Sequence, residues 1–142
     1  MKLLRKVIRR LCLRAHRSRI ATGMIPLSEV FSVVVFVDDS EAGLEPLKVA
    51  IKSFFAKGGA VVRFIRADDE DVRTASDLFI SLAAQPCIAE RYAAVCSGAR
   101  FKIGRHQFPG QVYDFVVKDP GEEPVPAADA FAMIQKLLTS IQ

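Results

Sequence analysis

Acidic side chains follow two apolar runs of this sequence, and clustered carboxylates are its nearest approach to a metal site. Asp38 and Asp39 end the run SVVVFVDD, and Asp68 follows the second run, Ala60–Arg66. If both runs are parallel strands, their carboxyl ends meet at one edge of the sheet, where ligands bind. Carboxylates there would suit Mg²⁺. The alternative, which we favour, is that these acids cap and charge-complement the starts of two helices.

A basic cluster forms the second candidate site. It consists of Arg100, Lys102, Arg105 and His106. Such side chains could hold a phosphate or a carboxylate. The alternative, again the one we favour, is an edge strand that positive charge protects from aggregation.

The remaining reactive residue types lack the spacing that catalysis or metal binding requires. Cys87 and Cys96 are nine residues apart, which is not a usual metal-ligand spacing, and Cys96 is expected to be a buried, inert thiol. No glycine-rich phosphate loop follows the first apolar run, so a dinucleotide site is not expected. No base is placed near a nucleophile. We therefore predict no cofactor and favour a non-enzymatic protein.

The elements that must position these residues are strands alternating with helices. The unbroken run Val33–Val37 indicates a strand at Ser32–Asp38 buried on both faces. A helix opens at Glu45-Pro46, buries Leu47, Ile51, Phe54 and Phe55, and stops at Gly58-Gly59. A second strand, Ala60–Arg66, completes a unit long enough for a parallel crossover.

The later part of the chain continues the alternation. Strands are predicted at Asp77–Leu82, Ala99–Gly104 and Val112–Val117, with a short helix from Asp68 to Ala75, a helix after Pro86 and a last helix at Ala127–Ile141. The helix after Pro86 is expected to bury Ile88, Tyr92, Val95 and Cys96. About seven residues separate the last two strands, too few for a helical crossover, which favours an antiparallel or irregular connection. The pattern predicts a three-layer α/β sandwich, Rossmann-like or flavodoxin-like, with a mostly parallel five-stranded sheet.

Charge divides the chain into two parts. Residues 1–22 carry eight Lys or Arg and no acid, whereas the net charge of the whole is +4, so the remainder has a net charge of −4. We predict a basic amphipathic helix over 1–22, a linker over 23–31 and a single α/β domain over 32–142. Because the basic character belongs to the start of the chain and not to the domain, nucleic acid is not the expected partner.

Helical spacing over residues 1–19 separates apolar from basic side chains. Leu4, Ile8 and Leu11 gather on one face, and Lys2, Arg5, Lys6, Arg9 and Arg10 gather opposite. Such a helix could lie on an anionic membrane surface. It could equally dock on its own domain or on a protein partner, or be a basic tail that is mostly disordered in water. The three cysteines, few and widely spaced, favour a reducing compartment, so we expect a cytoplasmic protein that a membrane-bound helix would place at the inner membrane.

Two resemblances accompany these patterns. The runs DLFISLA (Asp77–Ala83), SGARFKIG (Ser97–Gly104) and VYDFVV (Val112–Val117) resemble a small protein family common in the Bacteroidota, a domain of unknown function, over roughly residues 32–141. That resemblance implies an α/β fold and brings no catalytic residues. The runs VVVFVDDS and DLFISLAAQP, with Lys118 before Pro120, resemble response-regulator receiver domains, but Leu82 stands where the phospho-accepting Asp is expected.

The sequence therefore supports two functional hypotheses. The first is a non-enzymatic α/β domain that binds a membrane surface or a protein through its basic N-terminal helix. The alternative is a small ligand-binding or Mg²⁺-binding domain that uses Asp38, Asp39 and Asp68. An NMR titration with Mg²⁺ tests the alternative, since unshifted signals of these carboxylates at millimolar Mg²⁺ would exclude it.

Overall fold

The sheet is five-stranded and entirely parallel, in the order β2-β1-β3-β4-β5. The structure, a computed structural model, describes residues 26–38, 43–67, 76–118, 121 and 124–140. The strands are β1 (Ser32–Phe36), β2 (Val61–Ile65), β3 (Leu78–Ser81), β4 (Phe101–Gly104) and β5 (Phe115–Val116). The predicted α/β sandwich is confirmed. The predicted helix over residues 1–22 and the short one over 68–75 lie outside the described residues.

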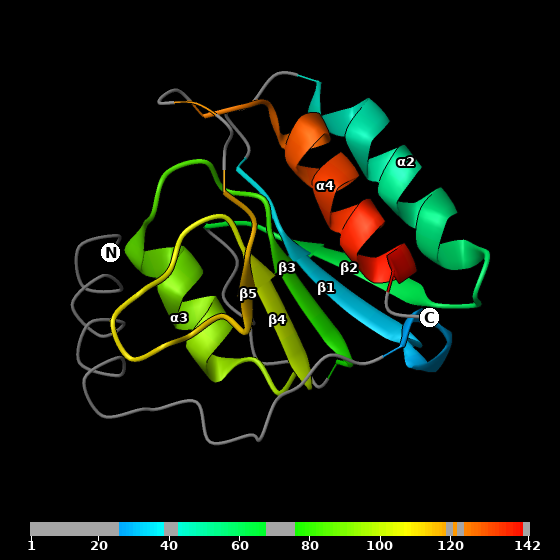
Figure 1. Ribbon diagram of the computed structural model, residues 1–142, viewed down its shortest axis with the longest axis horizontal. Helices are drawn as coiled ribbons and strands as arrows, with labels where there is room; N and C mark the ends of the chain where they lie inside the picture. Colours follow the sequence, from blue (N-terminus) through cyan, green and yellow to red (C-terminus); the bar gives the residue numbers. More distant parts are fainter. Residues whose placement is uncertain (1–25, 39–42, 68–75, 119–120, 122–123, 141–142) are drawn as a thin grey trace.

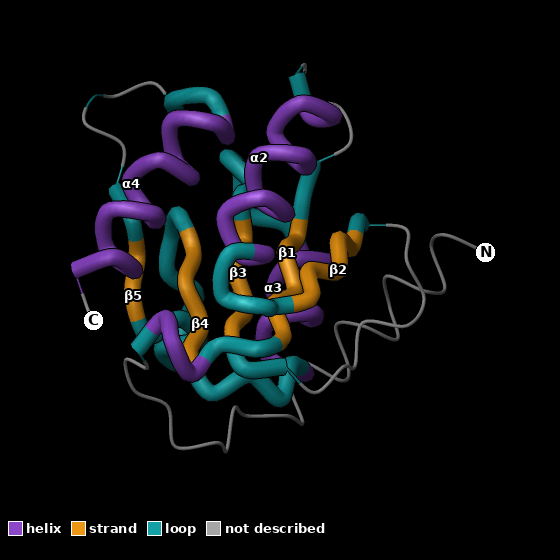
Figure 2. Tube along the Cα trace, turned by 90° about the vertical axis from the view of Figure 1, so that its right-hand side faces the viewer, coloured by secondary structure: helices purple, strands orange, loops and turns teal. Residues whose placement is uncertain are grey.

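Helices cover both faces of the sheet (Figures 1 and 2). Helices α2 (Leu44–Ala56) and α4 (Ala127–Ser140) lie side by side on one face, and α3 (Ile88–Cys96) lies on the other. A short 3-10 helix, η1 (Leu27–Glu29), precedes β1 within the predicted linker. The result is three layers with the sheet in the middle.

Strand β1 is buried on both faces, as its sequence predicts. Val33 and Val35 join the core beneath α2 and α4, and Val34 and Phe36 join the core beneath α3. An unbroken apolar run is stable here because each alternate side chain meets a helix-covered core. The stripe predicted for α2 is confirmed at Leu47, Ile51 and Phe55, whereas Phe54 is half-buried. Helix α4 buries Phe131, Ile134 and Leu138 in the same core.

Of the two connections expected before β5, the antiparallel one is wrong, because β4 and β5 pair in parallel, and the irregular one is confirmed, because no helix forms between them. The strand begins at Phe115 and not at Val112, so residues 105–114 are available for the crossover. This loop runs beside α3 in Figure 1 without forming a helix. Asp114 fixes its end: its N–H donates to the carbonyl of Lys102, and its carboxylate accepts from the Lys102 N–H, both at 2.8 Å.

Two burial predictions are also wrong. Strand β4 is not an edge strand with a polar face: it lies between β3 and β5, and all four of its residues are buried. Helix α3 buries Glu90, Ala93 and Ala94, whereas the four residues predicted to be buried are half-buried. Small alanines let the helix approach the sheet closely, and the buried carboxylate of Glu90 is tolerated because it has hydrogen-bond partners.

Candidate functional site

The strand order places the ligand edge of this fold between β1 and β3. The chain passes from β1 to β2 on one side and then returns across β1 to form β3 on its other side. In open α/β sheets the crevice at the carboxyl ends of such strands is the usual binding place. Asp38 follows β1 there and is exposed, and Ser81 ends β3. The acids that the sequence singles out follow β1 and β2, whereas this crevice lies between β1 and β3, the central strand of the sheet.

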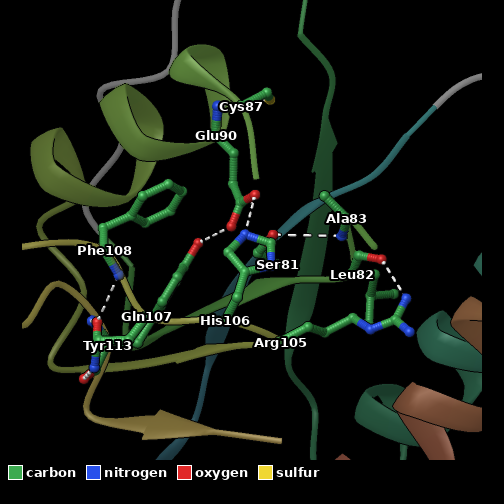
Figure 3. Close-up of polar contacts among 10 residues, drawn as sticks. All are labelled: Ser81, Leu82, Ala83, Cys87, Glu90, Arg105, His106, Gln107, Phe108 and Tyr113. Carbon is green, nitrogen blue, oxygen red and sulfur yellow. Dashed lines mark hydrogen bonds and ion pairs between the residues drawn. The ribbon is translucent and has the colours of Figure 1, made fainter. Parts of the chain in front are cut away.

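A cluster of polar side chains gathers beside this edge around Glu90, which is fully buried (Figure 3). The Tyr113 hydroxyl donates to Glu90 Oε2 at 2.5 Å, and His106 Nε2 lies 2.8 Å from Glu90 Oε1. We call Ser81, Cys87, Glu90, His106 and Tyr113 the Glu90 cluster. Three elements supply it: the end of β3, the first turn of α3 and the loop between β4 and β5.

The loop holds its part of the cluster through Gln107. The Gln107 side-chain amide donates to the carbonyl of Tyr113 at 2.8 Å and accepts from the Tyr113 N–H at 2.9 Å. The Tyr113 ring lies directly over Gly104, where a Cβ atom would approach ring carbons to 2.4 Å. Only glycine leaves room for the ring at this point of β4.

Burial governs the protonation of the cluster. Desolvation raises the pKa of Tyr113 well above its ordinary value of 10.0, and the negative charge of Glu90 acts in the same direction. Desolvation likewise raises the pKa of the Cys87 thiol; the hydrogen bond from the Glu90 N–H opposes this rise, and the negative charge of Glu90 adds to it. Both groups are therefore held in their neutral forms, and Tyr113 remains a hydrogen-bond donor to the carboxylate.

The geometry assigns Cys87 to helix capping. Its Sγ accepts from the Glu90 N–H at 3.4 Å at the first turn of α3. A thiol with a raised pKa is a poor nucleophile, because the thiolate is the reactive form. The cluster therefore has a structural role. The two carboxylate oxygens of Glu90 bond to His106 and Tyr113 and so link α3 to the β4–β5 loop.

Arg105 and Asp77, two side chains that stand in sequence motifs noted above, also join separate elements of the fold. Arg105 Nη1 donates to the carbonyl of Leu82 at 3.2 Å, and Nη2 donates to that of Val125 at 2.7 Å, which joins the end of β3 to the segment before α4. Asp77 Oδ2 accepts from the N–H groups of Phe31 and Ser32, at 2.8 and 3.2 Å, at the opposite edge of the sheet.

The structure does not bring the four predicted anion-binding residues together. Arg100 is exposed before β4, Lys102 is buried within it, and Arg105 and His106 follow it and bond different elements. Burial lowers the pKa of Lys102, which the charge of Asp114 partly opposes. Anion binding at these residues stays a prediction.

Only one residue of the predicted cation site, Asp38, lies within the described part of the chain. Asp39 and Asp68 lie outside the described residues, and Asp38 is exposed at the edge. Among the residues that the structure describes, no group of three or more His, Cys, Asp or Glu side chains could hold a metal ion. The cation site therefore also stays a prediction.

Sequence reasoning missed Glu90 and Tyr113. Glu90 stands three residues after Cys87 on a predicted helix, the spacing at which a glutamate is ordinarily read as an exposed first-turn acid. In the sequence Tyr113 belongs to the run VYDFVV, which indicates only a strand. Their partnership depends on the path of the β4–β5 loop, for which the sequence carries no local signal.

Comparisons with known proteins add no relative. Neither a family model, nor a curated protein, nor a solved structure matches this chain. Both resemblances stay predictions. At the receiver position, Leu82 is 1% exposed and belongs to the core beneath α2 and α4.

Proposed function

We propose that this chain is a non-enzymatic α/β module that attaches to an anionic membrane surface through residues 1–19. The observation that carries the proposal is the segregation of charge: eight Lys or Arg and no acid in residues 1–22, against a net charge of −4 in the remainder. A basic segment with an apolar face gains from burying that face among acyl chains, and its cations gain from anionic headgroups.

The ties within the domain support a binding role over a catalytic one. Glu90, Arg105 and Asp77 each use their charged atoms to join elements of the fold. Groups engaged in this way rigidify a scaffold. The part of the chain that the structure describes contains no helix long and apolar enough to cross a bilayer.

Cosedimentation of the full chain with vesicles tests the proposal. We expect binding to phosphatidylglycerol-containing vesicles at low salt, weaker binding at high salt, and little binding to phosphatidylcholine alone. Replacing Arg5, Arg9 and Arg10 by Gln should weaken binding about tenfold or more, since each cation near such a surface contributes on the order of 1 kcal/mol.

A matched control removes three exposed charges from the domain: Lys52→Gln, Arg100→Gln and Lys136→Gln. We expect this variant to retain most of the vesicle binding. Absence of binding by the unaltered chain, or an equal loss in the control, would refute the proposal and direct attention to a protein partner for residues 1–19.

A further inference from the structure

A pocket of about 540 Å³ opens at the amino edge of the sheet, far from the Glu90 cluster. The end of α2 supplies Phe54 and Phe55, the segments that lead into β1 and β2 supply Val30 and Ala60, and the last turn of α4 supplies Thr139. The volume falls within the range of small-molecule sites, and most of the lining is apolar. An occupant of matching chemistry is a flexible hydrocarbon chain.

The surface beside the pocket is apolar as well. Phe31 is 63% exposed and Val61 is 71% exposed, and the Val61 N–H donates to the carbonyl of Phe31 at 2.9 Å. Each residue directly follows a pocket residue, Val30 and Ala60 respectively. Two exposed large side chains joined at the rim of an apolar pocket mark a surface that contacts an apolar phase.

Positive charge lies at the same corner. Lys57 lines the pocket and is exposed. Leu27, another lining residue, stands five residues after the basic segment 1–22 in the sequence. A cation at the mouth of an apolar pocket complements a ligand with a hydrocarbon chain and an anionic head.

We propose that this pocket binds one acyl chain of an anionic lipid, with the head beside Lys57 and with Phe31 and Val61 against the membrane surface. The inference rests on the proposed function, because residues 1–22 would hold this corner of the domain at the bilayer. It deepens that function by naming the ligand of the domain itself.

A fluorescent fatty acid, cis-parinaric acid, tests the pocket with the full chain in solution. We expect saturable binding of one probe per chain. Thr139→Trp, which fills the pocket from an exposed position, should weaken binding at least fivefold, and Lys57→Glu should weaken it severalfold. Ala132→Trp and Lys136→Glu, exposed positions of α4 outside the lining, are the matched controls and should leave the affinity unchanged.

The outcomes separate this inference from the proposed function. Because the probe needs no vesicle, loss of vesicle binding with intact probe binding would refute only the membrane role of residues 1–19. Absence of saturable probe binding, or equal losses in the controls, would overturn the acyl site. Tighter probe binding after replacing Leu4, Ile8 and Leu11 by Ser would show that the chain's own N-terminal segment occupies the pocket, which also overturns it.

Discussion

The residue that explains most about the domain interior is Glu90, a carboxylate with no exposed surface. Burying an ion is costly unless hydrogen bonds replace its hydration. Tyr113 and His106 provide those bonds from a loop more than ten residues further along the chain. The partners are interdependent: the phenol stays protonated because it is buried against the carboxylate, and the carboxylate is tolerated because the phenol donates to it.

Gly104 gives a prediction at this scale. In Gly104→Ala, the new Cβ would meet the Tyr113 ring within 2.4 to 2.7 Å, so the ring must move away from Glu90. We expect the free energy of unfolding to fall by about 2–3 kcal/mol, because the core becomes overpacked and a buried hydrogen bond is strained. Urea unfolding measures the loss.

Gly58→Ala is the control for Gly104→Ala. Its nearest neighbour would be the Phe55 carbonyl at 3.8 Å, an ordinary contact, so we expect a change within about 0.5 kcal/mol. If the two substitutions cost the same, the close approach of Tyr113 to β4 is not what requires glycine at position 104.

At the scale of elements, side chains hold strands together where the backbone ladder ends. Asp77 precedes β3 and accepts from two N–H groups at the start of β1, while its own N–H donates to the Ser32 hydroxyl at 3.0 Å. Arg105 performs a comparable task at the other edge with two carbonyls. Short strands need such ties, because β3 and β4 have only four residues each.

Asp77→Ala tests the tie between β1 and β3. The substitution leaves the N–H groups of Phe31 and Ser32 without their acceptor, and we expect a loss of about 1–3 kcal/mol of unfolding free energy. Asp77→Asn keeps a side-chain oxygen as acceptor and should cost clearly less. Thermal and urea unfolding of both variants measure the two losses. If Asp77→Ala and Asp77→Asn lose the same unfolding free energy, the charge of Asp77, and not its acceptor oxygen, stabilises the strand ends.

At the scale of the whole molecule, the two edges of the sheet differ in chemistry. The carboxyl edge gathers the polar Glu90 cluster, and the amino edge combines an apolar pocket with the exposed Phe31 and Val61. Leu27, which stands five residues after the basic segment 1–22 in the sequence, lines the pocket at the amino edge. The carboxyl edge also holds Tyr113, whose raised pKa contributes to the dependence of stability on pH.

The raised pKa of Tyr113 determines the sign of a pH effect on folding. Above about pH 10 an unfolded tyrosine loses its proton. The folded protein retains that proton on Tyr113, so the stabilisation from Tyr113 is complete below pH 10 and is lost as pH rises toward the raised pKa. The difference in unfolding free energy between the unaltered chain and Tyr113→Phe should be constant from pH 7 to 9.

Above pH 10 we expect that difference to shrink, by at most about 1.4 kcal/mol per pH unit. Urea unfolding at a series of pH values measures it, and Tyr92→Phe corrects for effects common to removing a phenol. A difference that stays constant through pH 11 would show that burial does not hold the Tyr113 proton.

The sequence by itself determined the layered α/β architecture, since the continuous run Val33–Val37 and the periodic stripes of α2 and α4 are local signals that burial enforces. It also located Asp38 at a strand end that borders the ligand edge. Only the tertiary structure decided that β5 is parallel, that Lys102 is buried and that Glu90 pairs with Tyr113 and His106. These features depend on which segments meet across the sheet. The local sequence around each residue does not specify which segments meet. The contacts form only when the loop of residues 105–114 packs against α3.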